Sequence, residues 1–189
     1  MLLYVVATFL YPGGNQFDKT FKGFSWAQNY WCNLLNEIAM NGEPNSARPV
    51  ALAAMVILCF SLAFFWYIFS LKAGFNKRGK IIIGLSGCIA MVFTIFLFTG
   101  YHDLIINVAT CFSLIAIAGT FKGLQILRWK KLLWFGIFNL SLIVVNNILY
   151  YNEGLIMYLP VVQKITFLFF LIWFCLVDFN LYKKECSKY

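Results

Sequence analysis

The sequence contains few charged residues, and its acidic residues are scarcer than its basic ones. Only 12% of its 189 residues are Asp, Glu, Lys or Arg, whereas 62% are hydrophobic and 20% are aromatic. A soluble globular domain is roughly a quarter charged, so this chain lacks the polar residues needed to cover a surface that faces water. The composition excludes an ordinary soluble domain and indicates that lipid surrounds most of the chain.

Histidine and paired cysteines are also scarce, which limits the chemistry that the chain supports. It has one histidine, His102, and six cysteines that form no CxxC pair. Four of the cysteines lie inside apolar runs, where a thiol behaves as a small hydrophobic group. We therefore expect no zinc site, no disulfide framework, no catalytic set and no cofactor.

Five long apolar runs are the most prominent feature of the sequence. Their approximate bounds are Pro49–Leu71, Ile81–Thr99, Leu104–Thr120, Leu132–Tyr151 and Tyr158–Leu181. Each is close to the ~20 residues that a helix needs to cross the hydrocarbon core of a membrane. We expect residues 1–189 to form a single, all-α, polytopic transmembrane helix bundle.

A sixth apolar run, Met1–Tyr11, precedes these five. As a helix it would reach only about 17 Å, which is too short to span. A signal peptide is not expected, because no basic region precedes the run. Either the chain lacks residues upstream of Met1, or this helix crosses only part of the bilayer. The bundle thus has about six helices, the first short or truncated.

The basic residues predict the orientation of the bundle. If the spans alternate, eleven of the fifteen fall on one side of the membrane: Lys72, Lys77, Arg78, Lys80, Lys122, Arg128, Lys130, Lys131, Lys183, Lys184 and Lys188. The positive-inside rule places this side in the cytoplasm. We expect cytoplasmic N- and C-termini in a cell inner membrane. The net charge of +8 then reflects orientation, and nucleic acid is not an expected partner.

The same topology places Pro12–Arg48 outside the cytoplasm as a long loop. Within it, Trp26–Met40 has the periodicity of an amphipathic helix, with an N-cap at Ser25 and a stop at Asn41-Gly42. Such a helix would lie in the membrane interface or cover the mouth of the bundle. Ordered loops of this length are often functional.

Polar residues gather toward the same outer side and indicate a polar pocket that opens there. The ligand-binding candidates are Asn29, Asn33, Glu37, His102, Asp103, Asn107, Asn146, Asn147 and Lys164. Polar side chains at membrane depth usually point into the bundle, and charged ones are candidates for function. An equally weighted alternative is that the amides only join neighbouring helices by hydrogen bonds.

Lys164 is the strongest single candidate, since it lies inside the outer part of the last span. Its ammonium group would either snorkel to the surface or pair with Glu37, Asp103 or Glu153 and bind an anionic headgroup or carboxylate. Snorkelling or a structural ion pair is slightly favoured. His102 and Asp103 form an acid/base pair only if they converge with Glu37, and they more often mark a helix start.

Two stretches in the first quarter of the chain carry a resemblance. They are Tyr11-Pro12-Gly13-Gly14, and Phe24-Ser25-Trp26 with Asn29 to Leu35, Asn41-Gly42, Asn45 and Ala47-Arg48-Pro49. Their placement between a first and a second helix resembles uncharacterised bacterial six-helix membrane proteins and, more distantly, the Frag1/DRAM/Sfk1-type families. That resemblance implies a role in membrane trafficking or lipid organisation and no catalytic residues to carry over.

Three functions follow, in order of preference. The first is binding of a lipid or small solute in the outward-facing pocket, in an accessory or transport role. The second is a structural subunit that contacts a membrane protein partner through Trp31, Leu34 and Ile38. The third is an enzyme at the outer interface. Membrane lipids are expected partners in each case.

Overall fold

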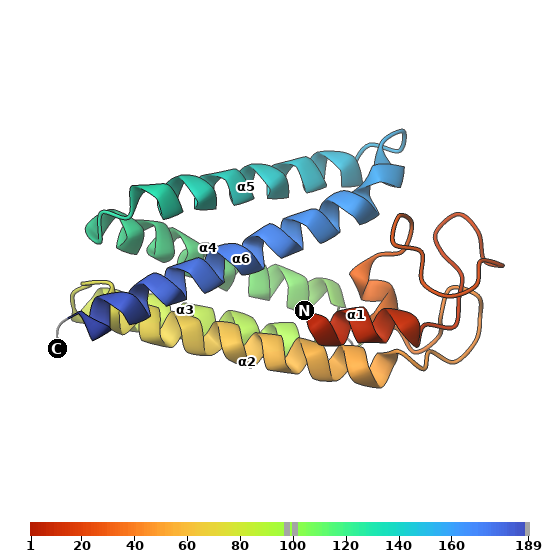
Figure 1. Cartoon of the computed structure of the whole chain (residues 1–189), viewed down its shortest axis with the longest axis horizontal. Helices are drawn as coiled ribbons and strands as arrows, with labels where there is room; N and C mark the ends of the chain where they lie inside the picture. Colours follow the sequence, from red (N-terminus) through yellow and green to blue (C-terminus); the bar gives the residue numbers. More distant parts are fainter. Residues whose placement is uncertain (97–98, 100–101, 188–189) are drawn as a thin grey trace. The chain divides into compact units, whose positions relative to one another are not determined.

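The computed structural model describes residues 1–96, 99 and 102–187, with His102 and Asp103 described only in their backbone. Its α-helices are α1 (Leu2–Phe9), α2 (Arg48–Lys72), α3 (Lys77–Ile95), α4 (His102–Ile126), α5 (Lys130–Tyr150) and α6 (Leu159–Cys186) (Figure 1). Two short 3₁₀-helices, η1 (Trp31–Leu35) and η3 (Ile156–Tyr158), complete the helical elements of this part of the chain. The described residues include no β-strand, so the all-α prediction is confirmed.

Among the described residues, five helices are long and apolar enough to cross a membrane. Their bounds are Arg48–Lys72, Lys77–Ile95, Leu104–Ile126, Lys130–Tyr150 and Ile156–Cys186. These five helices correspond to the five predicted apolar runs, but most of their first and last residues differ from the predicted ones. The remaining helix, α1, has only eight residues, as expected for a short first helix.

The five helices expose apolar side chains outward. Only 17 to 33% of the residues in the most apolar window of each helix are buried. Large side chains such as Phe60, Phe64, Leu114, Trp134 and Val144 are exposed instead. Exposed apolar surface of this extent is not stable in water, whereas in a membrane it contacts lipid tails. The architecture is that of an integral membrane protein.

Residue contacts divide the chain into two compact units. Unit 1 comprises Met1–Ile57 and Leu140–Phe169, and unit 2 comprises Leu58–Asn139 and Phe170–Tyr189. The boundaries fall inside α2, α5 and α6, so each of these helices contributes residues to both units.

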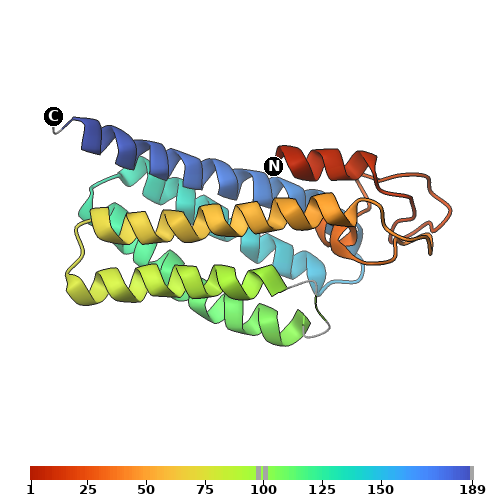
Figure 2. The ribbon, with the colours of Figure 1, turned by 90° about the horizontal axis from the view of Figure 1, so that it is seen from below.

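Small residues allow the helices of unit 2 to pack closely. A Cβ atom built on Gly87 of α3 would lie 2.4 Å from the indole of Trp66 on α2, so only glycine fits there. The Trp66 Nε1–H donates to Thr120 Oγ1 of α4 at 3.2 Å. Figure 2 shows α3 and α4 running side by side. Close approach of this kind drives helix association in lipid, where the hydrophobic effect does not.

The turn between α4 and α5 has a strained residue. Arg128 has a φ of 57°, in the left-handed region that favours glycine. The Arg128 N–H donates to Gln125 O at 3.0 Å and the Trp129 N–H donates to Leu124 O at 2.9 Å, which is the bonding pattern of a Schellman motif. A left-handed arginine costs roughly 1 kcal/mol relative to its ordinary conformation.

Candidate functional site

Unit 1 contains an ordered segment, Pro12–Arg48, which we call the cap (Figure 1). Isolated bridges join Gly13 to Lys22 and Ile38 to Pro44, so the cap folds into two narrow turns. The Asn41 N–H donates to the Gly13 carbonyl at 3.1 Å and ties the two turns together. The cap is therefore held by its own hydrogen bonds rather than by one long helix.

The predicted amphipathic helix over Trp26–Met40 is wrong in extent, because only η1, five residues long, forms there. The physical reason is competition from asparagine side chains. Asn29 Oδ1 accepts the Ser25 N–H at 2.8 Å, and Asn33 Oδ1 accepts the Tyr30 N–H at 2.7 Å. Local bonds of this type offer the backbone an alternative to the α-helical ladder.

Asn29 and Asn33, which the sequence indicates as pocket residues, lie inside the cap. Asn29 is fully buried and Asn33 is 5% exposed. The Asn29 Nδ2 donates to the Gly14 carbonyl at 2.9 Å and to Asn33 Oδ1 at 3.4 Å. Both side chains thus hold the fold of the cap, and their contact with a ligand stays a prediction.

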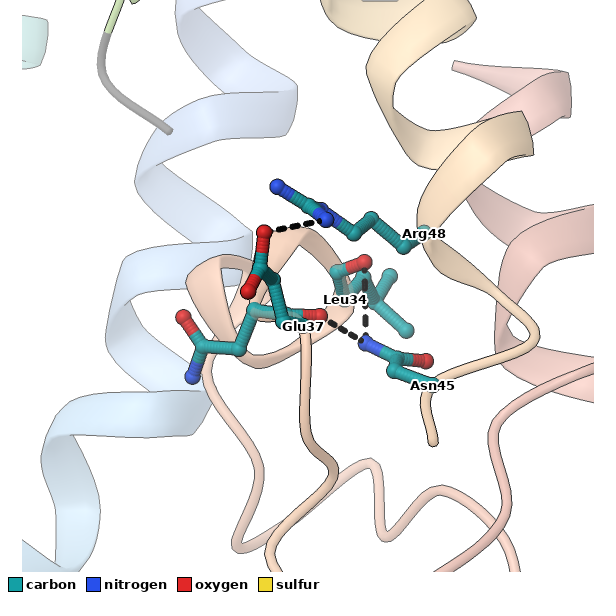
Figure 3. Close-up of polar contacts among 5 residues, drawn as sticks. Leu34, Glu37, Asn45 and Arg48 are labelled. Carbon is teal, nitrogen blue, oxygen red and sulfur yellow. Dashed lines mark hydrogen bonds and ion pairs between the residues drawn. The ribbon is translucent and has the colours of Figure 1, made fainter. Parts of the chain in front are cut away.

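Asn45 joins the end of the cap to η1. Its Nδ2 donates to the carbonyls of Asn33 at 3.0 Å, Leu34 at 3.2 Å and Asn36 at 2.9 Å. Its Oδ1 accepts the Ala47 N–H at 3.1 Å, directly before α2 begins. Figure 3 shows the amide aimed at the Leu34 carbonyl. One buried side chain therefore fixes the exit of η1 and the entry to α2.

Arg48, the first residue of α2, is a charged residue that the sequence analysis does not list among the site candidates. Its Nη1 lies 2.8 Å from Glu37 Oε1 (Figure 3), and the two side chains are 25% and 73% exposed. The Arg48 Nε is buried and has no partner among the described residues. The sequence contains a usable signal, since Arg48 starts a span but does not belong to the eleven cations that are predicted to lie in the cytoplasm.

Lys164 of α6 is buried, with 9% exposure. Its ammonium group donates to the backbone carbonyls of Asn29 in the cap and of Pro160 one turn earlier in α6, the second at 2.9 Å. The prediction favours snorkelling or a structural ion pair, and the structure shows neither among the described side chains. Lys164 instead fastens the cap to α6.

Two aromatic faces surround the same ammonium group. The Lys164 Nζ lies 5.5 Å from the ring centroid of Phe24 and 5.7 Å from that of Trp31. The two rings are stacked with centroids 6.1 Å apart. Tyr4 of α1 and Phe167 of α6 pack around Trp31 at 5.5 and 6.3 Å. Cation–π attraction helps to offset the desolvation of a buried ammonium ion.

No carboxylate lies within ion-pair distance of Lys164 in the part of the chain whose side chains are described. Glu37, one predicted partner, binds Arg48 instead. An ammonium group has three N–H donors and Lys164 uses two. Trp31 Nε1 and Gln163 Oε1 are also buried without a described partner. Buried polar groups normally have partners, so the Lys164 ammonium group and Trp31 Nε1 each have a hydrogen-bond donor to spare.

The other predicted site residues whose side chains are described, Asn107, Asn146 and Asn147, make no hydrogen bond to Lys164. Asn146 joins α5 to α6 by donating to Thr166 Oγ1 at 2.6 Å, which fits the alternative of interhelical bonding. Asn147 is exposed and donates to Ile143 O of its own helix at 2.9 Å. Asn107 is exposed in unit 2. The His102–Asp103 acid/base prediction falls outside the described side chains.

Burial and hydrogen bonds shift the pKa values of titratable groups in the cap and of Tyr11, the residue directly before it. Burial raises the pKa of the Tyr11 hydroxyl, which accepts the Met40 N–H at 3.0 Å. Burial also raises the pKa of Tyr30. Hydrogen bonds from the Thr20 hydroxyl and N–H lower the pKa of the exposed Asp18. The phenols therefore stay neutral and Asp18 stays ionised near neutral pH.

Comparison with known proteins identifies no relative. No protein-family model, curated protein or solved structure matches this chain.

Proposed function

We propose that this protein is a bacterial inner-membrane protein that binds an anionic lipid or small anionic solute at its capped end, in an accessory or transport role. In this proposal the cap lies outside the cytoplasm and both termini lie inside. The observation that carries it is the buried Lys164 ammonium group, which has no carboxylate partner among the described side chains. Charged groups at membrane depth are rare and usually mark a functional site.

The charge balance of the cap and its anchors supports an anionic ligand. Arg48 is the last residue of the cap, and Lys164 binds the cap through the Asn29 carbonyl. Of these two cations only Arg48 pairs with a described carboxylate, that of Glu37. A phosphate or carboxylate group would neutralise the remaining charge and would accept the N–H groups that Lys164 and Trp31 have to spare. The ligand chemistry is therefore that of a phosphate or carboxylate, on a lipid headgroup or a free solute.

A second candidate function is a structural or partner-binding subunit. The apolar face predicted for it is only partly present, because Trp31 and Leu34 are buried and Ile38 alone is exposed, at 54%. Exposed Phe17 and Trp26 add to the apolar surface of the cap. A membrane protein that co-purifies with the wild type but not with Ile38→Ser would favour this function.

The lipid-binding proposal predicts that an anionic lipid slows amide exchange in the cap. The full chain would be placed in nanodiscs of phosphatidylcholine, with or without phosphatidylglycerol, and hydrogen exchange followed by mass spectrometry for the segment from Asn29 to Leu35. We expect about 5-fold slower exchange with phosphatidylglycerol, as one buried cation gains an anionic partner. Lys164→Met abolishes this difference, and Lys164→Arg retains it.

The matched control is Lys22→Met, which removes one exposed cation from the same cap. It should respond to phosphatidylglycerol as the wild type does. Protection by soluble glycerol phosphate in phosphatidylcholine discs would identify a solute as the ligand. Equal exchange of the wild-type cap with phosphatidylglycerol, phosphatidylcholine and glycerol phosphate would refute the proposal.

A further inference from the structure

Unit 2 contains a cavity of about 440 Å³ beside the turn between α4 and α5. Its lining consists of Arg128, Trp129, Lys130, Lys131, Leu132 and Asn180, and we call it the basic cavity. Three of these six residues are cations and none is a carboxylate. The volume lies within the range of roughly 300–1,000 Å³ that is common for small-molecule sites.

The walls of the basic cavity are fixed by hydrogen bonds. The Schellman motif at the end of α4 places Arg128 and Trp129. The Trp173 Nε1–H of α6 donates to the Leu132 carbonyl at 2.7 Å, which holds α6 against the start of α5. Asn180, on the same helix, completes the wall. The cations are therefore presented on a built surface.

The charges and backbone donors of the basic cavity are suited to an anion. Lys130 and Lys131 are the first two residues of α5, and a cation is disfavoured at the positive end of a helix. The backbone N–H groups of Lys130, Lys131 and Leu132 have no backbone acceptor within the described residues. Arginine also occupies a left-handed position that glycine would adopt without strain. An oxyanion would satisfy these donors and offset the clustered charge.

We infer that the basic cavity binds the phosphate headgroup of an anionic phospholipid. Trp129 beside the cations is typical of the membrane interface, where indole rings lie at the level of the headgroups. Basic pockets between membrane helices on the positively charged side are suited to such headgroups. This site shares no residue with the Lys164 cluster, because its lining residues belong to unit 2 and Lys164 belongs to unit 1.

The test uses Arg128→Gly, a variant that removes the charge while relieving the left-handed strain. Native mass spectrometry of the full-length protein would measure binding of phosphatidylglycerol. We expect about 5-fold weaker binding for the one cation removed, with a thermal unfolding temperature that is not lowered. Weakening of binding without loss of stability separates ligand recognition from misfolding.

The matched controls remove charge from the start of α3. Arg78→Gln should change binding by less than about 2-fold, because Arg78 does not line the basic cavity and an exposed charge is screened by salt. Phosphatidylglycerol binding at the basic cavity should be lost in the triple variant Arg128→Gly, Lys130→Gln, Lys131→Gln. It should be kept in the control triple variant Lys77→Gln, Arg78→Gln, Lys80→Gln. Lys164→Met should also keep it.

Three outcomes would overturn the inference. One is equal weakening in the basic-cavity and control variants, which would reflect net charge alone. Another is equally tight binding of phosphatidylcholine, which carries the same phosphodiester but no net charge. The third is displacement of phosphatidylglycerol by an equal concentration of glycerol phosphate, which would assign the cavity to a soluble phosphate.

Discussion

Gly14→Ala is expected to unfold the cap. Gly14 has a φ of +78°, and a Cβ atom there would lie 2.3 Å from the backbone nitrogen of Asn41 and 2.5 Å from the carbonyl carbon of Met40. Both contacts are with backbone, which has no rotamer that relieves them. The expected loss is more than about 3 kcal/mol of cap stability, because steric overlap and a left-handed alanine both contribute.

Gly23→Ala is the matched control for this substitution. Gly23 has a similar φ of +73°, but nothing lies within 4 Å of its Cβ position. Gly23→Ala should lower the stability of the cap by only about 1 kcal/mol, which is the cost of a left-handed alanine without steric overlap. Hydrogen exchange of the segment from Trp31 to Met40 measures both variants in nanodiscs. The account of the cap is contradicted if the two alanines accelerate exchange to the same extent.

Asn45→Ala is expected to release η1 from the start of α2. The substitution leaves the carbonyls of Asn33, Leu34 and Asn36 without the donor that they share. Since each buried unsatisfied group costs about 1–3 kcal/mol, we expect the cap to lose about 3 kcal/mol. Chymotrypsin cleavage at Trp31, which is 7% exposed in the folded cap, should accelerate about 100-fold if cleavage follows the open population.

The control for this prediction is Asn36→Ala. The Asn36 side chain is exposed, and only its backbone carbonyl takes part in the Asn45 set. Its cleavage rate should stay within about 2-fold of the wild type, as is usual for a surface substitution. Rapid cleavage of both variants, or of neither, would show that Asn45 does not hold η1 in place.

The membrane spans could be predicted from the sequence because hydropathy is a local property. A run of apolar residues such as Pro49–Leu71 identifies a span without knowledge of its neighbours. The predicted run and α2 (Arg48–Lys72) differ by one residue at each end. Short loops rich in lysine and arginine give the predicted orientation by the same local reasoning.

The fold of the cap could not be predicted in this way, because its contacts are not local. The bond between Lys164 and the Asn29 carbonyl joins residues 135 positions apart. Asn29 and Asn33 have the spacing of an α-helical face, but their side chains replace helical hydrogen bonds instead of supporting them. Periodicity predicts a helix at Trp26–Met40 because it does not register this competition.

The candidate site was predicted in part. Lys164 is singled out by its position inside a span, and its role as a ligand-binding residue stays a prediction, whereas its hydrogen-bond partners could be found only in the structure. Arg48 was missed because the orientation argument counted the cations that obey the positive-inside rule and set aside those that do not. Lysine and arginine at the outer ends of spans are thus worth listing as candidates in their own right.

Topology is the measurement that tests the central claim most directly, since the proposed function requires the cap and the basic loops to face opposite sides of the membrane. In a cysteine-free background, Lys19→Cys in the cap and Lys77→Cys at the start of α3 would be treated in intact spheroplasts with a membrane-impermeant maleimide. Both positions are exposed. We expect Lys19→Cys to react at once and Lys77→Cys to react only after permeabilisation. Labelling of both positions in intact spheroplasts would contradict the account.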